Sequence, residues 1–141
     1  MEVFTDEWCT ACCAAMNARE SYRQAAAGWD QGAVVLVMTA DPAQGVPAER
    51  AAWIDMHQGA CRGSRMATPA DREAATYVLQ ADPAGWKKLL SGETEPVPAM
   101  MTGKLRLTRG SLFALARYAQ AAREMVHAAG DAGGTFPDAP G

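Results

Sequence analysis

Four cysteines are the residues of this sequence whose type and spacing most suggest chemistry. Cys9 and Cys12 have the Cys-x-x-Cys spacing of zinc sites and redox enzymes, and Cys13 follows directly. A zinc site needs two further ligands, so Cys61 and a histidine would have to converge on this pair. A redox motif begins a helix after a strand, whereas these cysteines fall inside a predicted helix. We therefore interpret Cys9, Cys12 and Cys13 as small buried side chains with no metal and no disulfide framework, and keep a redox or metal-binding protein as the weaker alternative.

His57 and Cys61 form a second candidate, because they flank a predicted hairpin turn and an imidazole can activate a thiol. Asp55 shares the face of His57 but lies two residues along, so it is poorly placed to orient the ring. Glu93 and Glu95 lie in a loop where nothing would desolvate one of the carboxylates. We expect no catalytic residues and no cofactor.

Composition narrows the classes of protein further. The chain has 141 residues, of which 49% are hydrophobic, so one domain with one core is expected over residues 1–130, followed by a Gly/Pro-rich tail over 131–141. The net charge of −3 gives no basic excess for nucleic acid. No stretch approaches the roughly 20 apolar residues of a membrane span. The N-terminus is acidic and lacks the layout of a signal peptide, so we expect a cytoplasmic protein with at most transient membrane contact.

The elements that must position these residues follow from local patterns. Thr5 is expected to cap one long helix that fades near Ala27. Residues 33–40 form an apolar run typical of a central strand buried on both faces. Residues 51–58 and 61–68 are predicted to be the arms of a hairpin joined at Gly59, and 73–81 to be a strand after a turn at Pro69.

The second half of the chain has clearer boundaries. Asp82 and Pro83 are a typical helix start, and Gly92 ends that helix. A short Met-rich segment from Pro96, a strand over 104–109 and one long final helix after Ser111 complete the order. These elements predict an α+β (α/β) fold with a five-stranded, mostly antiparallel sheet covered on one face by helices.

The segment from Asp82 to Tyr118, DPAGWKKLLSGETEPVPAMMTGKLRLTRGSLFALARY, resembles the sterol carrier protein 2 (SCP-2) sterol-binding domain family in its bacterial stand-alone form. The resemblance rests on an ordered set of features. These are a capped helix with a large apolar residue and Leu-Leu-Gly, a Pro-containing linker, a short apolar helix, Gly-Lys-Leu, an alternating strand and a helix started by Gly. The acidic residue that usually follows that last Gly is Ser111 here.

The resemblance implies an apolar tunnel between the sheet and the last helices, which would hold a fatty acid, an acyl-CoA, a sterol or another lipid. It implies no metal, nucleotide or catalytic constellation, and the expected partner is a small hydrophobic ligand. Flexible methionines suit a wall that fits variable lipids. The alternative for the same residues is ordinary core packing. The predicted tunnel lining is Trp86, Leu90, Met100, Met101, Leu105, Leu107, Leu112, Phe113 and Ala116.

A third possibility is an interaction module without a ligand. Trp29 and Trp53 could then be exposed anchors, and the chain could form a homodimer through the first helix or an edge strand.

Overall fold

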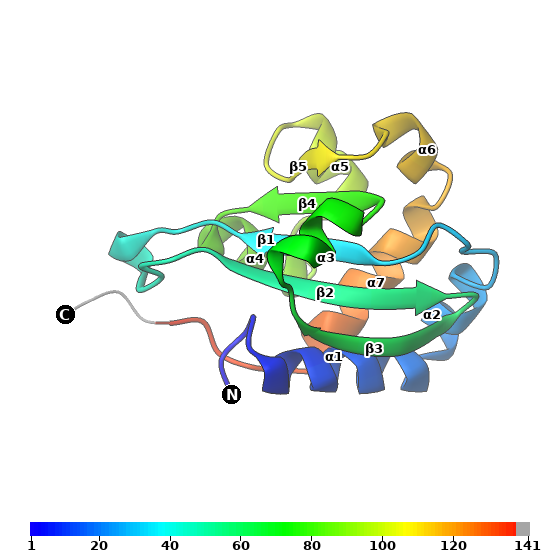
Figure 1. Cartoon of the computed structure of the whole chain (residues 1–141), viewed down its shortest axis with the longest axis horizontal. Helices are drawn as coiled ribbons and strands as arrows, with labels where there is room; N and C mark the ends of the chain where they lie inside the picture. The colour runs from blue at the N-terminus through cyan, green and yellow to red at the C-terminus, as the bar shows by residue number, and fades with distance from the viewer. Residues whose placement is uncertain (138–141) are drawn as a thin grey trace.

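A single five-stranded sheet organises the computed structural model, which describes residues 1–137 (Figure 1). The strand order is β3-β2-β1-β4-β5. The two central strands β1 and β4 run parallel and every other neighbouring pair is antiparallel, which confirms the predicted mostly antiparallel sheet. The strands are β1 (Val34–Met38), β2 (Arg50–His57), β3 (Ala60–Met66), β4 (Tyr77–Ala81) and β5 (Arg106–Arg109).

The central strand β1 is buried along its whole length, as its apolar run predicts. Alternate side chains enter different clusters. Leu36 and Met38 join the main core, whereas Val35 and Val37 point to a smaller cluster on the opposite face.

The β2–β3 hairpin is confirmed, and its turn shows why it forms. Gln58 and Gly59 both have positive φ angles, 46° and 87°, as a type I′ turn requires. A Cβ on Gly59 would lie 2.6 Å from the carbonyl oxygen of Arg23, so the position needs glycine for space as well as for backbone conformation.

The first helix is shorter than predicted. Thr5 caps it through a 3.3 Å bond that Oγ1 accepts from the Trp8 amide, but the helix ends at Ala18 and a second helix begins at Glu20. Arg19, between them, is extended, with φ −93° and ψ 106°. The break gives α1 (Asp6–Ala18) and α2 (Glu20–Ala25) separate directions, and both pack against the last helix.

Two other predicted boundaries are wrong. Residues 69–74, taken as a turn and the start of a strand, form the helix α3 (Pro69–Ala74), because Thr68 and Asp71 complete a capping box around it. The predicted single final helix is divided into α6 (Leu112–Ala116) and α7 (Ala119–Asp131). The remaining elements are η1 (Pro42–Gln44), α4 (Pro83–Leu90) and α5 (Pro96–Met101).

The helices form one main layer and one minor cover. The main core lies between the sheet and α1, α2, α4 and α7, and it holds most of the buried aromatic side chains. The short helix α3 covers part of the other face (Figure 1), where Ala75 and Val78 pack with the second side of β1. α5, β5 and α6 lie together at the β4 side of the sheet (Figure 1).

The two ends of the described chain meet. The Val3 amide donates to the carbonyl of Thr135 at 3.0 Å, and the Thr135 amide donates to the carbonyl of Met1 at 2.8 Å. Phe136 packs, half-buried, against the main core. Residues 138–141 of the predicted tail lie outside the described residues. Within residues 1–137, none of the helices has the length and hydropathy needed to cross a membrane.

Candidate functional site

The predicted tunnel residues divide into an inner and an outer group. Trp86 and Leu105 are buried, with 1% and 2% of their surface exposed, in the cluster between the sheet and the main helical layer. Leu90, Met100 and Leu107 pack, partly buried, against the same cluster. The structure therefore brings these inner residues together on one side of the sheet.

The outer group lies at the surface. Phe113 is 86% exposed, Met101 is 76% exposed and Leu112 is 40% exposed, and Ala116 is also exposed. These residues belong to α5 and α6. Leu115 is the one buried side chain of α6.

Two groups of aromatic side chains pack in the main core, and only Trp86 and Trp29 among them were singled out from the sequence. The Phe4 ring stacks on Trp8 with centroids 4.8 Å apart and meets Trp86 at 5.4 Å. Trp86 also donates from Nε1 to the carbonyl of Val37 at 2.8 Å. These contacts fix the position of Trp86, which comes from a different part of the sequence than its aromatic neighbours.

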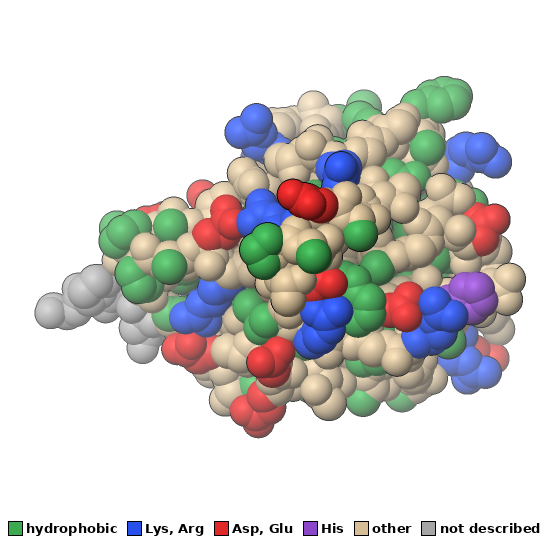
Figure 2. Space-filling model, viewed as in Figure 1, with side chains coloured by type: hydrophobic (Ala, Val, Ile, Leu, Met, Phe, Trp, Pro, Cys, Tyr) green, Lys and Arg blue, Asp and Glu red, His purple; other side chains and the backbone are tan. Residues whose placement is uncertain are grey.

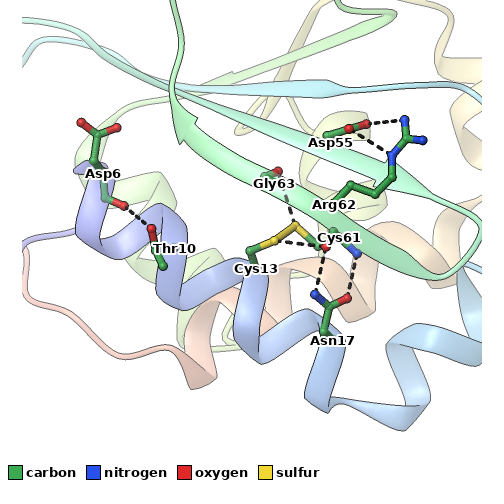
Figure 3. Close-up of a disulfide and its surroundings, with 8 residues drawn as sticks. All are labelled: Asp6, Thr10, Cys13, Asn17, Asp55, Cys61, Arg62 and Gly63. Atoms are coloured by element: carbon green, nitrogen blue, oxygen red, sulfur yellow. Dashed lines mark hydrogen bonds and ion pairs between the residues drawn. A yellow bond between two sulfur atoms is a disulfide. The ribbon is translucent and has the colours of Figure 1, made fainter.

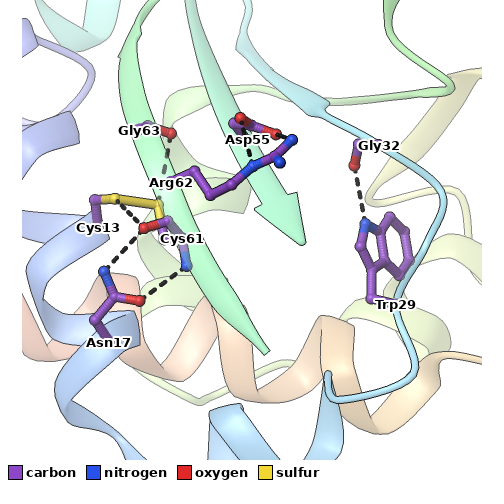
Figure 4. Close-up of polar contacts among 8 residues, drawn as sticks. All are labelled: Cys13, Asn17, Trp29, Gly32, Asp55, Cys61, Arg62 and Gly63. Atoms are coloured by element: carbon purple, nitrogen blue, oxygen red, sulfur yellow. Dashed lines mark hydrogen bonds and ion pairs between the residues drawn. A yellow bond between two sulfur atoms is a disulfide. The ribbon is translucent and has the colours of Figure 1, made fainter. Parts of the chain in front are cut away.

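The second aromatic group anchors the end of α6. The Trp29 ring lies 4.9 Å from Tyr118 and 5.7 Å from Tyr77, measured between centroids. Trp29 is only 2% exposed and donates from Nε1 to the carbonyl of Gly32 at 2.9 Å (Figure 4). The suggestion that Trp29 is an exposed anchor is therefore wrong. Trp53 is half-buried, with the guanidinium of Arg65 4.3 Å from its ring centroid.

Two buried polar atoms in the core have no hydrogen-bond partner among the described residues. They are Nε1 of Trp8 and Oη of Tyr22. Burial raises the pKa of the Tyr22 hydroxyl, so it stays neutral. An unpaired buried hydroxyl costs about 1–3 kcal/mol, and a ligand with a polar atom could satisfy it.

A hollow of about 540 Å³, lined by both apolar and charged residues, lies next to the carboxyl ends of β1 and β4. Lys88, Lys104 and Arg106 contribute its cations. Asp82 contributes a carboxylate, which already accepts a 2.7 Å bond from the Gly85 amide as the cap of α4. Its three cations could meet an anionic group, and no motif in the sequence predicted the hollow.

The cysteines do not form a catalytic or metal centre among residues 1–137. Cys9 and Cys12 are buried, as expected, and desolvation raises the pKa of the Cys9 thiol to about 11 and also raises that of Cys12. Thiols with raised pKa values are poor nucleophiles and poor metal ligands at neutral pH. No group of three His, Cys, Asp or Glu side chains in the described chain is arranged to hold a metal ion.

Cys13 is a correction to the sequence interpretation, because it forms a disulfide with Cys61 (Figure 3). The two Cα atoms are 5.4 Å apart although the residues are 48 apart in sequence. The sequence analysis expected no disulfide because it placed no helix against β3, whereas in the structure α1 packs along that strand. Asn17 strengthens the same junction: its side-chain amide donates to and accepts from the backbone of Cys61, both at 2.9 Å (Figures 3 and 4).

The disulfide also rules out the proposed dyad. His57 is exposed and pairs with Ala60 in the hairpin, while Cys61 pairs with Met56 and has no free thiol. Asp55 forms an ion pair with Arg62 at 3.1 Å instead of orienting an imidazole (Figure 4).

Glu95 is likewise engaged structurally. It forms ion pairs with Arg123 at 3.4 Å and His127 at 3.3 Å. Both partners lie on α7, so the contacts tie the start of α5 to that helix.

Comparison with known proteins gives a family and two similar solved structures. The sequence model of the SCP-2 sterol transfer family matches residues 15–122. A crystal structure of sterol carrier protein 2 is 42% identical, with a TM-score of 0.80, over 91% of this chain and 97% of that one. The solution structure of a conserved hypothetical protein, possibly a sterol carrier protein, from Thermus thermophilus is 41% identical, with a TM-score of 0.82, over 96% of this chain and 92% of that one.

A more distant structure agrees in fold alone. The apo form of sterol carrier protein 2 from Yarrowia lipolytica is 16% identical, with a TM-score of 0.55, over 85% of this chain and 87% of that one. No curated protein matches the sequence.

Proposed function

We propose that this chain, which belongs to the SCP-2 sterol transfer family, binds a hydrophobic ligand in an apolar tunnel and carries it without chemical change. The ligand class is a fatty acid, an acyl-CoA, a sterol or another lipid. Membership rests on the family match over residues 15–122 and on two relatives more than 40% identical, and it confirms the resemblance carried by Asp82–Tyr118.

The observation that carries the proposal for this chain is the inner group of apolar residues. They come from α4, α5 and the last strand, and they meet in the layer between the sheet and α7. Small side chains on the buried side of α7 favour a layer that can open: these are Ala121, Ala122, Ala128 and Ala129. The driving force would be desolvation of the ligand, about 25 cal/mol per Å² of apolar area removed from water.

Entry of a ligand requires part of this layer to move. α5 has six residues and α6 has five, too few to be stable alone in water. We infer that these two helices open locally and that Phe113 and Met101, exposed in the closed protein, border the entrance.

The polar end of a ligand would need a partner inside the protein. The Tyr22 hydroxyl has no partner among the described residues and is fully buried, so it is our candidate for that contact. A bond from a ligand oxygen would offset the cost of burying it.

Carriage without turnover is supported by the state of the cysteines. The Cys9 thiol is protonated at neutral pH because burial raises its pKa to about 11. Cys61 pairs with Met56 in the hairpin, on the opposite face from His57. A cytoplasmic location is part of the same proposal. Since glutathione keeps cytoplasmic thiols reduced, Cys13 and Cys61 should be free when thiols are trapped in growing cells. A disulfide in the trapped sample would instead indicate an oxidising compartment.

The two neighbouring methionines of α5 provide a matched test. Met100 packs against the core, whereas Met101 is 76% exposed. Titration with a fluorescent fatty acid should show changed affinity for Met100→Ala and nearly unchanged affinity for Met101→Ala. Phe113→Ala should change the rate of uptake more than the final affinity. Equal effects of both methionine variants, or none for Met100→Ala and Phe113→Ala, would argue against this placement of the site.

A further inference from the structure

The edge of the molecule formed by α5, β5 and α6 has a charge opposite to that of the chain. The protein has 13 basic and 16 acidic residues, yet residues 96–123 contain five lysines or arginines and no aspartate or glutamate. The rest of the sequence is therefore strongly acidic. Four of the cations lie in or beside α5, β5 and α6, which the fold brings together at this edge (Figure 1), and the fifth, Arg123, lies on α7.

Three of these cations have no ion-pair partner within residues 1–137. They are Lys104, Arg106 and Arg117, which lie before β5, in β5 and after α6. The other two are engaged: Arg109 donates to backbone carbonyls of Arg72 and Glu73, and Arg123 pairs with Glu95. The unpaired charges are thus available to an external partner.

The same edge exposes large apolar side chains. Phe113, Met101 and Leu112 belong to α5 and α6, and they account for all but one of the exposed large hydrophobic residues among those described. The exception, Met1, is at the other end of the chain. In Figure 2 a hydrophobic group projects at this edge of the molecule, with Lys and Arg side chains along it.

We propose that the α5–α6 edge, defined as Met101, Lys104, Arg106, Leu112, Phe113 and Arg117, docks reversibly on an anionic lipid bilayer. Apolar side chains that enter the interface beside cations that meet lipid phosphates are the combination that a peripheral membrane contact requires. The apolar component favours a bilayer over nucleic acid, whose backbone offers phosphates alone. The acidic remainder of the surface turns this edge, rather than another face, toward the membrane. The contact goes beyond ligand binding and does not depend on it.

Co-sedimentation with vesicles of phosphatidylcholine, with and without phosphatidylserine, tests the proposal on the full chain. The protein should bind the anionic vesicles more tightly, and added salt should weaken that binding because it screens the charges. Arg106→Gln combined with Arg117→Gln should weaken binding about fivefold for each cation. Arg23→Gln is the matched control, since Arg23 is exposed on α2, away from this edge, and should leave binding unchanged.

A second variant, Phe113→Ser, tests the contribution of the apolar side chains to vesicle binding. Phe113→Ser should weaken vesicle binding about tenfold or more. Phe113 is 86% exposed, so the fold should survive, which circular dichroism would check. Equal binding to neutral and anionic vesicles, no binding to either, or unchanged binding by Phe113→Ser would overturn the proposal. A dimer in light scattering that Phe113→Ser dissociates would also overturn it, by assigning the edge to a second copy of the chain. Titration with a fatty acid in the absence of vesicles measures ligand binding in the proposed tunnel, so a failure of membrane docking can be distinguished from a failure of ligand binding.

Discussion

The Cys13–Cys61 disulfide gives the most quantitative prediction of the structure, since its removal changes one covalent link and leaves the native contacts in place. It joins α1 to β3, residues 48 apart in the chain. In the chain-entropy account, closing a loop of this size stabilises the folded state by about 4 kcal/mol, because the unfolded chain loses freedom. Reduction should therefore lower the free energy of unfolding by up to about 4 kcal/mol.

Urea denaturation with and without dithiothreitol measures this difference. Thiol titration of the denatured protein should find two free cysteines before reduction, Cys9 and Cys12, and four afterwards. The double variant Cys13→Ala/Cys61→Ala is the control, because its stability should resemble that of the reduced protein and should not respond to dithiothreitol.

Fatty acid affinity should survive the reduction. The two hydrogen bonds between Asn17 and the Cys61 backbone remain, and they continue to hold β3 on α1. Four free thiols before reduction would show that the bond does not form. A fully reduced protein as stable as the oxidised one would refute the loop argument itself.

Three further predictions concern single sites. Tyr22→Phe removes an unpaired buried hydroxyl, so urea unfolding of the ligand-free protein should show a free energy of unfolding about 1 kcal/mol higher, while ligand affinity falls. A lower free energy of unfolding would show that the hydroxyl has a partner. Gly59→Ala should destabilise the protein by about 1–3 kcal/mol, and more than Gly92→Ala, which has a similar φ but nothing within 4 Å of the added Cβ. Burial acts to raise the pKa of Glu124, but bonds from Arg19 and Ser21 outweigh it and the net pKa is lowered. Ionised Glu124 therefore stabilises the fold at pH values above its usual pKa, and this stabilisation is lost as the pH falls through the lowered pKa. Arg19→Ala should lower the free energy of unfolding by about 1–3 kcal/mol at neutral pH and make stability depend less on pH in the acid range. A variant with the same dependence of stability on acid pH as the parent protein would contradict this prediction.

Local patterns predicted most of the sheet because their signals lie in neighbouring residues. The run Val34–Met38 is apolar throughout and is buried on both faces. Gln58 and Gly59 lie between two strand-like segments, and Asp82 caps α4 as its position before Pro83 predicts. In each case the residues that decide the structure are adjacent in the sequence.

The interrupted helices could not be predicted in the same way. Arg19 sits inside an uninterrupted helical pattern, and its contact with Glu124 on α7 becomes visible only when the distant helix is in place. Near Pro69 the capping box of Thr68 and Asp71 outweighed an alternating pattern that favoured a strand.

The ligand site itself remains a prediction, and only the packing of its residues can be compared with the structure. The resemblance pointed to residues of one segment, and the structure places its inner members together. It could not reveal Phe4, Trp8 or Tyr22, because their proximity to Trp86 and α7 depends on how the N-terminal helices dock. The disulfide was missed for the same cause, since a separation of 48 residues leaves no local signal.

Native mass spectrometry of the purified protein tests the central claim of lipid binding most directly. We predict a non-covalent adduct at one lipid per chain, lost on delipidation, restored by incubation with the identified lipid, and weakened in Met100→Ala but not in Met101→Ala. A protein that shows only its own mass, both as purified and after incubation with fatty acids, acyl-CoA and sterols, would contradict the account.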